Sequence, residues 1–300
     1  MTAVHAIGVD VGGTKAAAVR VGRDGVVQAR AAVQTPADDV PALLASMVDV
    51  ARSVMGPDVA AIGVGAAGLV EAGTGRVRYA PNISWREVDL GRVLGVLGVP
   101  VVADNDCTVA ALGEHLVGAG RSIDDLLYVG VGTGIGGGIV SGGRVLRGAN
   151  GFAAEVGHIV VEPGGVLCGC GNQGCWETVA SGSALSRLGR ERLDPKADGR
   201  AVVAAARAGD ATARAILQDV GGRLGEGVAG LINVLDPELV IVGGGAAAGA
   251  GDLLLDPARI ACRRAVEGVG HRPDVPLVAA GLGADGAAIG AGLWALEVAA

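Results

Sequence analysis

Lysine is scarce in this sequence: Lys15 and Lys196 stand against 22 arginines, and no run of basic residues occurs. With a formal net charge of −7, we expect neither nucleic acid nor a membrane surface as a partner. Glycine or a charged residue interrupts every apolar run before it reaches about 18 residues, which predicts no transmembrane helix. The first residues lack a basic segment and a long apolar stretch, so we expect no signal peptide and a cytoplasmic location.

Composition indicates a globular protein, because half of the 300 residues are hydrophobic and only 18% are charged. The 54 glycines show no Gly-X-Y period, which excludes a collagen-like chain. They gather in doublets and triplets beside apolar runs, which indicates tight turns or loops that face a ligand. Five cysteines without a secretion signal indicate thiols or metal ligands rather than disulfides.

Apolar runs typical of strands alternate with segments of helical spacing, which predicts an α/β architecture. The segment AIGVDVGGTKAAAV from residue 6 resembles LYVGVGTGIGGGIV from residue 127. Two such strand-turn-strand segments predict two related lobes around a central cleft, with a boundary near residues 117–122. A long helix is predicted over residues 210–235, where glycines at positions 221, 222, 225, 227 and 230 would allow close packing.

Two glycine patterns do not fit a dinucleotide-binding fold. The G-x-G-x-x-G match at residues 63–68 is followed by a turn-rich segment instead of a helix. A second match at residues 281–286 has too little sequence after it to complete a strand-helix-strand unit. Neither lysine follows a glycine, so the P-loop pattern is absent as well.

The turn at residues 10–15, Asp-Val-Gly-Gly-Thr-Lys, lies between two predicted strands. Gly12 and Gly13 would let backbone N–H groups approach a phosphate, while Thr14 adds a hydroxyl and Lys15 a cation. Asp10 would act through Mg²⁺ or its waters, because this ion prefers oxygen ligands. The alternative is a structural hairpin turn. A second turn, Gly132-Thr133-Gly134, favours phosphate binding, since two such loops could hold a triphosphate between the lobes.

Three cysteines and a histidine follow the spacing H-x9-C-x-C-x4-C, at His158, Cys168, Cys170 and Cys175. Three thiolates and one imidazole are a good tetrahedral set for zinc, and with no position left for water the site would be structural. The alternative is a cluster of buried free cysteines. The polar residues around it are candidates for ligand binding, since a His158 nitrogen that does not hold zinc can donate to a ligand oxygen. These residues are Glu155, His158 and Glu177.

The chain resembles the ROK family of bacterial sugar kinases in five segments, in order, from about residue 7 to 290. They are DVGGTK at 10–15, ADND at 103–106, AAEVGH at 153–158, CGCGNQGCWE at 168–177 and LDPELVIVGGG at 235–245. The cysteine block with its Trp-Glu is most similar to that of actinobacterial ATP-dependent glucokinases. The resemblance implies an α/β, actin-like ATPase (RNase H-like) fold with two lobes. We expect residues 1–118 plus the C-terminal helix 286–300 in one lobe, and residues 119–285, with a zinc loop at 158–175, in the other.

The resemblance also implies roles for individual residues. Asp106 matches the catalytic aspartate, and Asn105 matches a preceding asparagine that hydrogen-bonds the sugar. The implied sugar-binding set is completed by Gly68, Asn82, Glu155, His158 and Glu177. The implied ATP contacts are Gly12, Gly13, Thr14, Thr133, Gly134 and Gly245. A carboxylate at the start of a helix suits the base that deprotonates a sugar hydroxyl, since we expect the helix N-terminus to keep it ionised. For Asp104 we expect helix capping.

The expected activity is phosphorylation of glucose at its 6-hydroxyl by ATP, with Mg²⁺ and structural Zn²⁺ as cofactors and a homodimer or dimer of dimers as the assembly. One alternative is a ROK kinase for N-acetylglucosamine, N-acetylmannosamine, fructose or allose. Another is a sugar-sensing ROK regulator; those carry a helix-turn-helix before the first strand, which here begins by about residue 4. A third is polyphosphate as the phosphoryl donor, although such relatives generally lack the cysteine block.

Overall fold

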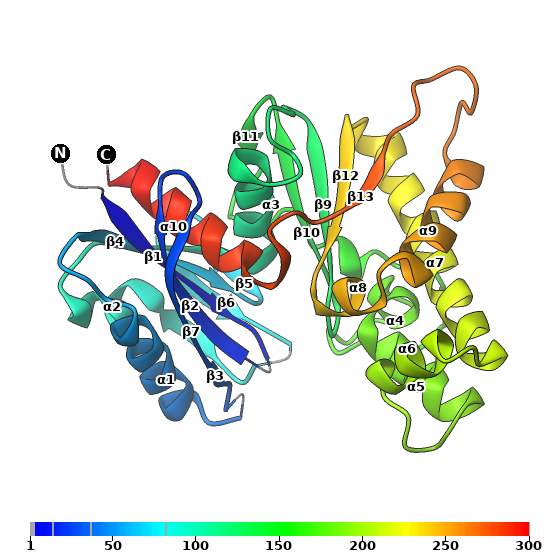
Figure 1. Ribbon diagram of the computed structural model, residues 1–300, viewed down its shortest axis with the longest axis horizontal. Helices are drawn as coiled ribbons and strands as arrows, with labels where there is room; N and C mark the ends of the chain where they lie inside the picture. Colours follow the sequence, from blue (N-terminus) through cyan, green and yellow to red (C-terminus); the bar gives the residue numbers. More distant parts are fainter. Residues whose placement is uncertain (1–3, 14, 37, 82, 300) are drawn as a thin grey trace. The chain divides into compact units, whose positions relative to one another are not determined.

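The computed structural model describes residues 4–13, 15–36, 38–81 and 83–299. The chain forms two compact units (Figure 1). The first contains residues 1–124, 138–154 and 284–300, and the second contains residues 125–137 and 155–283. Two predicted sites, Thr14 and Asn82, lie outside the described residues. Among the described residues, no helix is both long and apolar enough to span a membrane.

The first unit is built on a five-stranded sheet in the order β3-β2-β1-β4-β8. Its strands are β1 (His5–Val11), β2 (Lys15–Gly22), β3 (Val27–Gln34), β4 (Val59–Ala66) and β8 (Val101–Asn105). β1 pairs antiparallel with β2 and parallel with β4, and β4 pairs parallel with β8. The carboxyl ends of β1, β4 and β8 therefore lie at the same edge of the sheet.

Helices flank this sheet: α1 (Val40–Ser53), α2 (Leu90–Leu94), α3 (Asp106–Val117) and α10 (Gly286–Val298). The C-terminal α10 returns to the N-terminal strands and packs on β1, β4 and α3 (Figure 1). The contact requires glycine, because a Cβ on Gly8 of β1 would lie 1.7 Å from the Ala288 carbonyl oxygen. A Cβ on Gly63 of β4 would lie 1.8 Å from the carbonyl oxygen of Ala291. Part of the glycine excess thus serves helix-on-sheet packing.

A small antiparallel sheet, β5-β6-β7, also belongs to the first unit. Its strands are β5 (Leu69–Glu71), β6 (Arg76–Tyr79) and β7 (Arg86–Asp89). The sequence predicts only a turn-rich stretch here, because the strands are short and Gly73, Gly75 and Pro81 lie between them. The sheet packs Val70 and Val77 into the core below it.

The second sheet has the order β11-β10-β9-β12-β13. Its strands are β9 (Leu126–Val131), β10 (Ile135–Ser141), β11 (Arg144–Val145), β12 (Leu239–Gly243) and β13 (Leu277–Ala279). β12 pairs parallel with both β9 and β13. β10 runs from the second unit into the first, where a Cβ on Gly138 would lie 2.4 Å from the Cys107 carbonyl oxygen of α3. This tight packing explains why residues 138–154 cluster with the first unit.

The helices of the second unit are α4 (Glu177–Ala180), α5 (Gly182–Arg192), α6 (Gly199–Arg207), α7 (Ala211–Leu235), α8 (Gly245–Ala250) and α9 (Asp252–Ala265). α7 matches the predicted long helix and packs closely on α9. Cβ atoms on Gly221 and Gly225 would lie 2.5 and 2.1 Å from carbonyl oxygens of α9. Gly222 and Gly230 have nothing within 4 Å of such a position, so the close-packing prediction was wrong for these two. Three 3₁₀ turns complete the elements, at Gly95–Leu97, Val156–His158 and Gly283–Asp285.

Candidate functional site

The first glycine turn connects β1 to β2. The Gly12 N–H donates to the Lys15 carbonyl oxygen at 3.1 Å. A Cβ at Gly12 would meet only that oxygen, at 3.8 Å, and the Lys15 side chain is exposed. Gly12 and Gly13 are half-buried, so the described part of the turn leaves room beside Gly12 for the proposed phosphate contact.

Asp10 stands near the carboxyl end of β1, in an acidic environment. Burial raises the pKa of Asp10 to about 7, with a further increase from Asp106 and Asp285 and a decrease from Lys15. Asp285, at the start of α10, also pairs with Arg30 at 3.2 Å. A hard divalent cation would relieve the repulsion among these carboxylates, so their chemistry fits Mg²⁺. Asp285 was missed by the sequence analysis, because it lies 275 positions from Asp10 and in no recognised motif.

Asp106 is the first residue of α3, and Asn105 is the residue that caps this helix. The Asn105 Oδ1 accepts hydrogen bonds from the N–H groups of Cys107 at 2.9 Å and Thr108 at 3.1 Å. Asp106 Oδ1 accepts from the Cys107 N–H at 2.8 Å. Burial raises the pKa of Asp106, and this hydrogen bond only partly opposes the increase. The expectation that the helix N-terminus keeps Asp106 ionised stays a prediction, since burial moves the pKa of this carboxyl up from its ordinary value.

Asn105 also joins the capped helix to the neighbouring turn at Gly68. Its Nδ2 donates to the Gly68 carbonyl oxygen at 3.1 Å. Gly68 has φ +102°, and a Cβ there would lie 2.3 Å from the Tyr79 carbonyl oxygen, so only glycine fits. Asp104 does not cap the helix as predicted. It is buried and accepts from Arg147 Nε at 2.6 Å.

The second glycine turn, between β9 and β10, is held from both sides. The N–H groups of Gly182 and Ser183, at the start of α5, donate to the carbonyl oxygens of Gly132 at 2.9 Å and Thr133 at 3.1 Å. On the other side, Glu177 Oε2 accepts from the Ile135 N–H at 3.3 Å. A Cβ on Gly134, the turn's third residue, would lie 2.2 Å from the same oxygen, so a larger residue there would displace the Glu177 carboxylate.

The predicted nucleotide residues of the second unit lie at one edge of its sheet. Thr133 and Gly134 follow β9, and Gly245 follows β12. β9 and β12 are parallel neighbours with Gly130 opposite Gly243, so both strands end at the same edge. Ligands of open α/β sheets bind outside the carboxyl ends of the strands, which is where these three residues stand.

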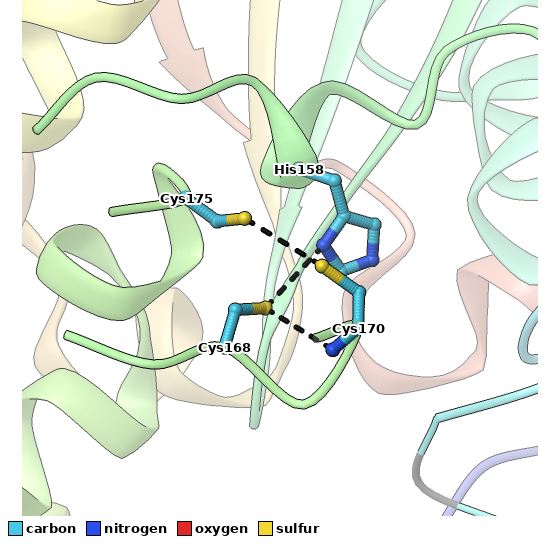
Figure 2. Close-up of side chains that lie close together, drawn as sticks. All are labelled: His158, Cys168, Cys170 and Cys175. Atoms are coloured by element: carbon cyan, nitrogen blue, oxygen red, sulfur yellow. Dashed lines mark hydrogen bonds between the residues drawn. The ribbon is translucent and has the colours of Figure 1, made fainter. Parts of the chain in front are cut away.

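The predicted metal ligands come together in the second unit (Figure 2). One ligand atom from each of His158, Cys168, Cys170 and Cys175 lies within 4.8 Å of all the others. Cys170 and Cys175 Sγ are 3.6 Å apart, and Cys168 Sγ is 3.6 Å from His158 Nδ1. A zinc–sulfur bond of about 2.3 Å gives tetrahedral sulfur–sulfur distances of about 3.8 Å, so the set fits a four-coordinate Zn²⁺.

Two carboxylates border this metal set. Glu177 Oε1 lies 3.7 Å from His158 Nδ1 and accepts from Cys168 Sγ at 2.8 Å. Glu155 Oε2 lies 3.9 Å from the other ring nitrogen, Nε2. Burial raises the pKa of the Cys168 thiol, and a bound zinc would remove its proton. The three residues predicted to bind the sugar in this unit are therefore neighbours, with Nδ1 of the histidine directed at the sulfurs.

Comparison with known proteins decides the family. The sequence pattern of the ROK family matches residues 6–298. The chain belongs to the ROK family. The glucokinase of Streptomyces coelicolor is 39% identical over 311 residues, with 97% of each chain covered. The glucokinase of Halalkalibacterium halodurans is 38% identical over 274 residues, covering 84% of this chain and 83% of the relative.

Among solved structures, the ROK glucokinase of Streptomyces griseus, crystallised with glucose and AMPPNP, is 39% identical. It superposes with a TM-score of 0.92 over 98% of this chain and 99% of that one. The predicted ROK membership and the actin-like α/β fold are confirmed by these matches. The expected His/Cys₃ group that could hold structural zinc is confirmed as well. The residue roles and the domain boundaries stay predictions.

Proposed function

We propose that this ROK protein phosphorylates glucose at the 6-hydroxyl with ATP, giving glucose 6-phosphate and ADP. The observation that carries the proposal is Asp106, a partly buried carboxylate at the start of α3 with a raised pKa. Support comes from the full-length similarity to a relative crystallised with glucose and AMPPNP. Phosphoryl transfer needs in-line placement, charge stabilisation and a group that deprotonates the attacking hydroxyl.

In the proposed reaction, Asp106 accepts the proton of the sugar hydroxyl while O6 bonds to the γ-phosphorus. The bond from this phosphorus to the bridging oxygen breaks, and ADP leaves with the electron pair. Asp10 would hold Mg²⁺ through oxygen contacts, and this cation would supply positive charge that neutralises the phosphates. The nucleotide contacts are proposed at Gly12, Gly13, Thr14, Lys15, Thr133, Gly134 and Gly245.

The sugar is proposed to bind through the side chain of Asn105 and through the residues beside the metal set. The full proposed set of sugar contacts is Gly68, Asn82, Asn105, Asp106, Glu155, His158 and Glu177. With zinc on Nδ1, His158 would keep Nε2 for a sugar hydroxyl, and the metal would fix the ring orientation. Four protein ligands would leave zinc no position for water, so its role would be structural.

We further propose that the protein acts in the cytoplasm as a homodimer or dimer of dimers, with no nucleic-acid partner. The absence of basic runs and the net charge of −7 support the last point. Light scattering coupled to size-exclusion chromatography would give the mass of the assembly. A monomer at micromolar concentration would contradict the oligomer.

A panel of sugars in an ADP-release assay tests the function. We expect turnover with glucose and ATP to exceed that with N-acetylglucosamine, N-acetylmannosamine, fructose or allose, and polyphosphate to replace ATP poorly. If another hexose gave a higher kcat/KM than glucose, that hexose would be the preferred substrate and the proposal of glucose would be wrong. Sugar binding without turnover on any donor would favour a sugar-sensing role over an enzyme.

A further inference from the structure

Arg147 forms an arrangement in the first unit that none of the proposed roles uses. Its Nε donates to Asp104 Oδ2 at 2.6 Å, and its guanidinium lies over the Trp294 ring, 4.9 Å from the centroid. Its carbonyl oxygen accepts from the Ala153 N–H at 3.1 Å. Arg147 thus joins three segments of one unit: the chain after β11, the end of β8 and helix α10.

Asp104 is an unusual residue to bury, with 3% of its surface exposed. Burial raises the pKa of Asp104, and Arg147 opposes the increase by its charge and hydrogen bond. The other oxygen, Oδ1, accepts from the backbone N–H of Asn105 at 2.9 Å. A buried carboxylate with this partner set is fixed in orientation, because each oxygen has one directed donor.

The ion pair of Arg147 and Asp104 is connected to Asp106 through Asn105. The backbone that Asp104 holds is that of Asn105, the capping residue of α3, whose side chain accepts from Cys107 and Thr108. Asp106 is the next residue, so its Cα position depends on the conformation of Asn105. The same asparagine reaches the Gly68 carbonyl oxygen through Nδ2. A shift of the Asn105 backbone would therefore move the proposed base and a proposed sugar ligand together.

We propose that Arg147 and Asp104 are positioning residues for phosphoryl transfer: their buried ion pair fixes the Asn105 backbone and thereby aims the Asp106 carboxylate. The inference rests on the proposed role of Asp106 as the base. Arg147 is suited to the task because its planar guanidinium makes a directed Nε–H contact and stacks on an aromatic face at the same time. Lysine could supply the charge but neither of these two constraints.

The test measures kcat, KM and equilibrium glucose binding for Arg147→Met, Arg147→Lys and Asp104→Asn. Misplacement of a reacting group by about 1 Å costs up to about 10²-fold, so we expect Arg147→Met to lower kcat by about 10- to 100-fold. The glucose dissociation constant should change less than about threefold, because Asn105 is one of several proposed sugar ligands and the others keep their positions. Arg147→Lys should recover only part of kcat. In Asp104→Asn the amide oxygen can still accept the hydrogen bond from the Asn105 N–H. We therefore expect this variant to lose less kcat than Arg147→Met.

The matched control is Arg259→Met in α9, since Arg259 also combines a backbone contact, to Leu277 O at 3.0 Å, with carboxylate partners. It should leave kcat unchanged. The Asp104→Asn/Arg147→Met double variant should be no slower than the slower single variant, because the pair acts as one unit. Glucose titration by calorimetry counts the folded sites in every variant, so a loss of folded protein is not read as a loss of kcat.

An unchanged kcat per folded site in Arg147→Met, with a lower melting temperature alone, would make the pair merely structural and overturn the inference. Additive losses in the double variant would also overturn it. Asp106→Asn, measured in parallel, separates the two levels. Full turnover in that variant removes the proposed base, whereas a slow Asp106→Asn beside a normal Arg147→Met rejects only the positioning role.

Discussion

The two strand-turn-strand segments of the chain share a backbone pattern but differ in what surrounds the turn. The turn after β1 follows Asp10, whose pKa is raised by burial and by the charges of Asp106 and Asp285. The turn after β9 has its carbonyl groups held by the N–H groups of Gly182 and Ser183. Similar glycine turns thus stand in different surroundings, with carboxylates near one and backbone hydrogen bonds around the other.

The largest effect is expected at Asp106, one of the carboxylates near the turn after β1. Asp106→Asn should lower kcat by about 10²–10⁴-fold, because the amide cannot accept a proton. The dissociation constant for glucose should change much less, since the amide still forms hydrogen bonds. Steady-state kinetics and calorimetry measure the two quantities. Asp252→Asn is a control at the first residue of α9, and unchanged turnover in Asp106→Asn would remove this residue from the mechanism.

Loss of a metal ligand tests whether zinc supports the second unit. Cys175→Ala should remove most of the bound zinc, lower the melting temperature and reduce activity by about 10- to 100-fold, because His158 loses its fixed orientation. Elemental analysis and thermal unfolding measure these changes. Cys262→Ala is the matched control, since Cys262 is also buried but lies on α9, outside the metal set. Wild-type protein with full activity and no metal would refute the zinc site.

Lowering the pH should reduce the reaction rate through Asp10, which precedes the turn after β1. The ionised form of Asp10 binds Mg²⁺, so at limiting Mg²⁺ the rate should fall as the pH drops through its pKa of about 7. The fall should approach about tenfold per pH unit. Because the cation competes with the proton, more Mg²⁺ should move the midpoint to lower pH. Asp285→Asn should also move the midpoint to lower pH, because it removes a negative charge that raises the pKa of Asp10. An unchanged midpoint in this variant would contradict the role of Asp10 as the Mg²⁺ ligand.

Ionisation of Asp10 should raise the reaction rate but lower the stability of the folded protein. Folding raises the pKa of Asp10 from 3.8 to about 7, so between these values the folded protein binds more protons than the unfolded chain. Without Mg²⁺, this carboxyl should therefore lower the free energy of unfolding as the pH rises through that window. Urea denaturation of wild type and Asp10→Asn at pH 5 and 7 measures the difference.

The smallest effect is expected at Glu177, which holds the second turn from outside. One hydrogen bond corresponds to about 0.5–1.5 kcal/mol, so Glu177→Ala should raise KM for ATP by about 2- to 10-fold. Glu177→Gln keeps an oxygen for the Ile135 N–H and should leave that KM nearly unchanged, while glucose affinity falls in both variants. Glu191→Ala on α5 is the control. An equal rise in the ATP KM for Gln and Ala would show that this contact does not hold the turn.

Local patterns predicted much of this molecule correctly. The four metal ligands lie within 18 residues, and their spacing predicted a set that the structure brings together. The glycines at 221 and 225 were correctly assigned to close helix packing, whereas 222 and 230 face away, because one helix face has only every third or fourth residue. The small β5-β7 sheet was missed, since strands of three or four residues have too short a pattern to recognise.

The sequence by itself determined the family, the α/β class, the two glycine turns and the metal-ligand set, because each depends on residues close together in the chain. Only the tertiary structure decided that Asp285 stands beside Asp10 and that Asp104 pairs with Arg147 instead of capping α3. It also decided that burial raises the pKa of Asp106 more than its hydrogen bonds lower it. Burial and long-range ion pairs depend on how distant segments pack, and no local spacing encodes that packing.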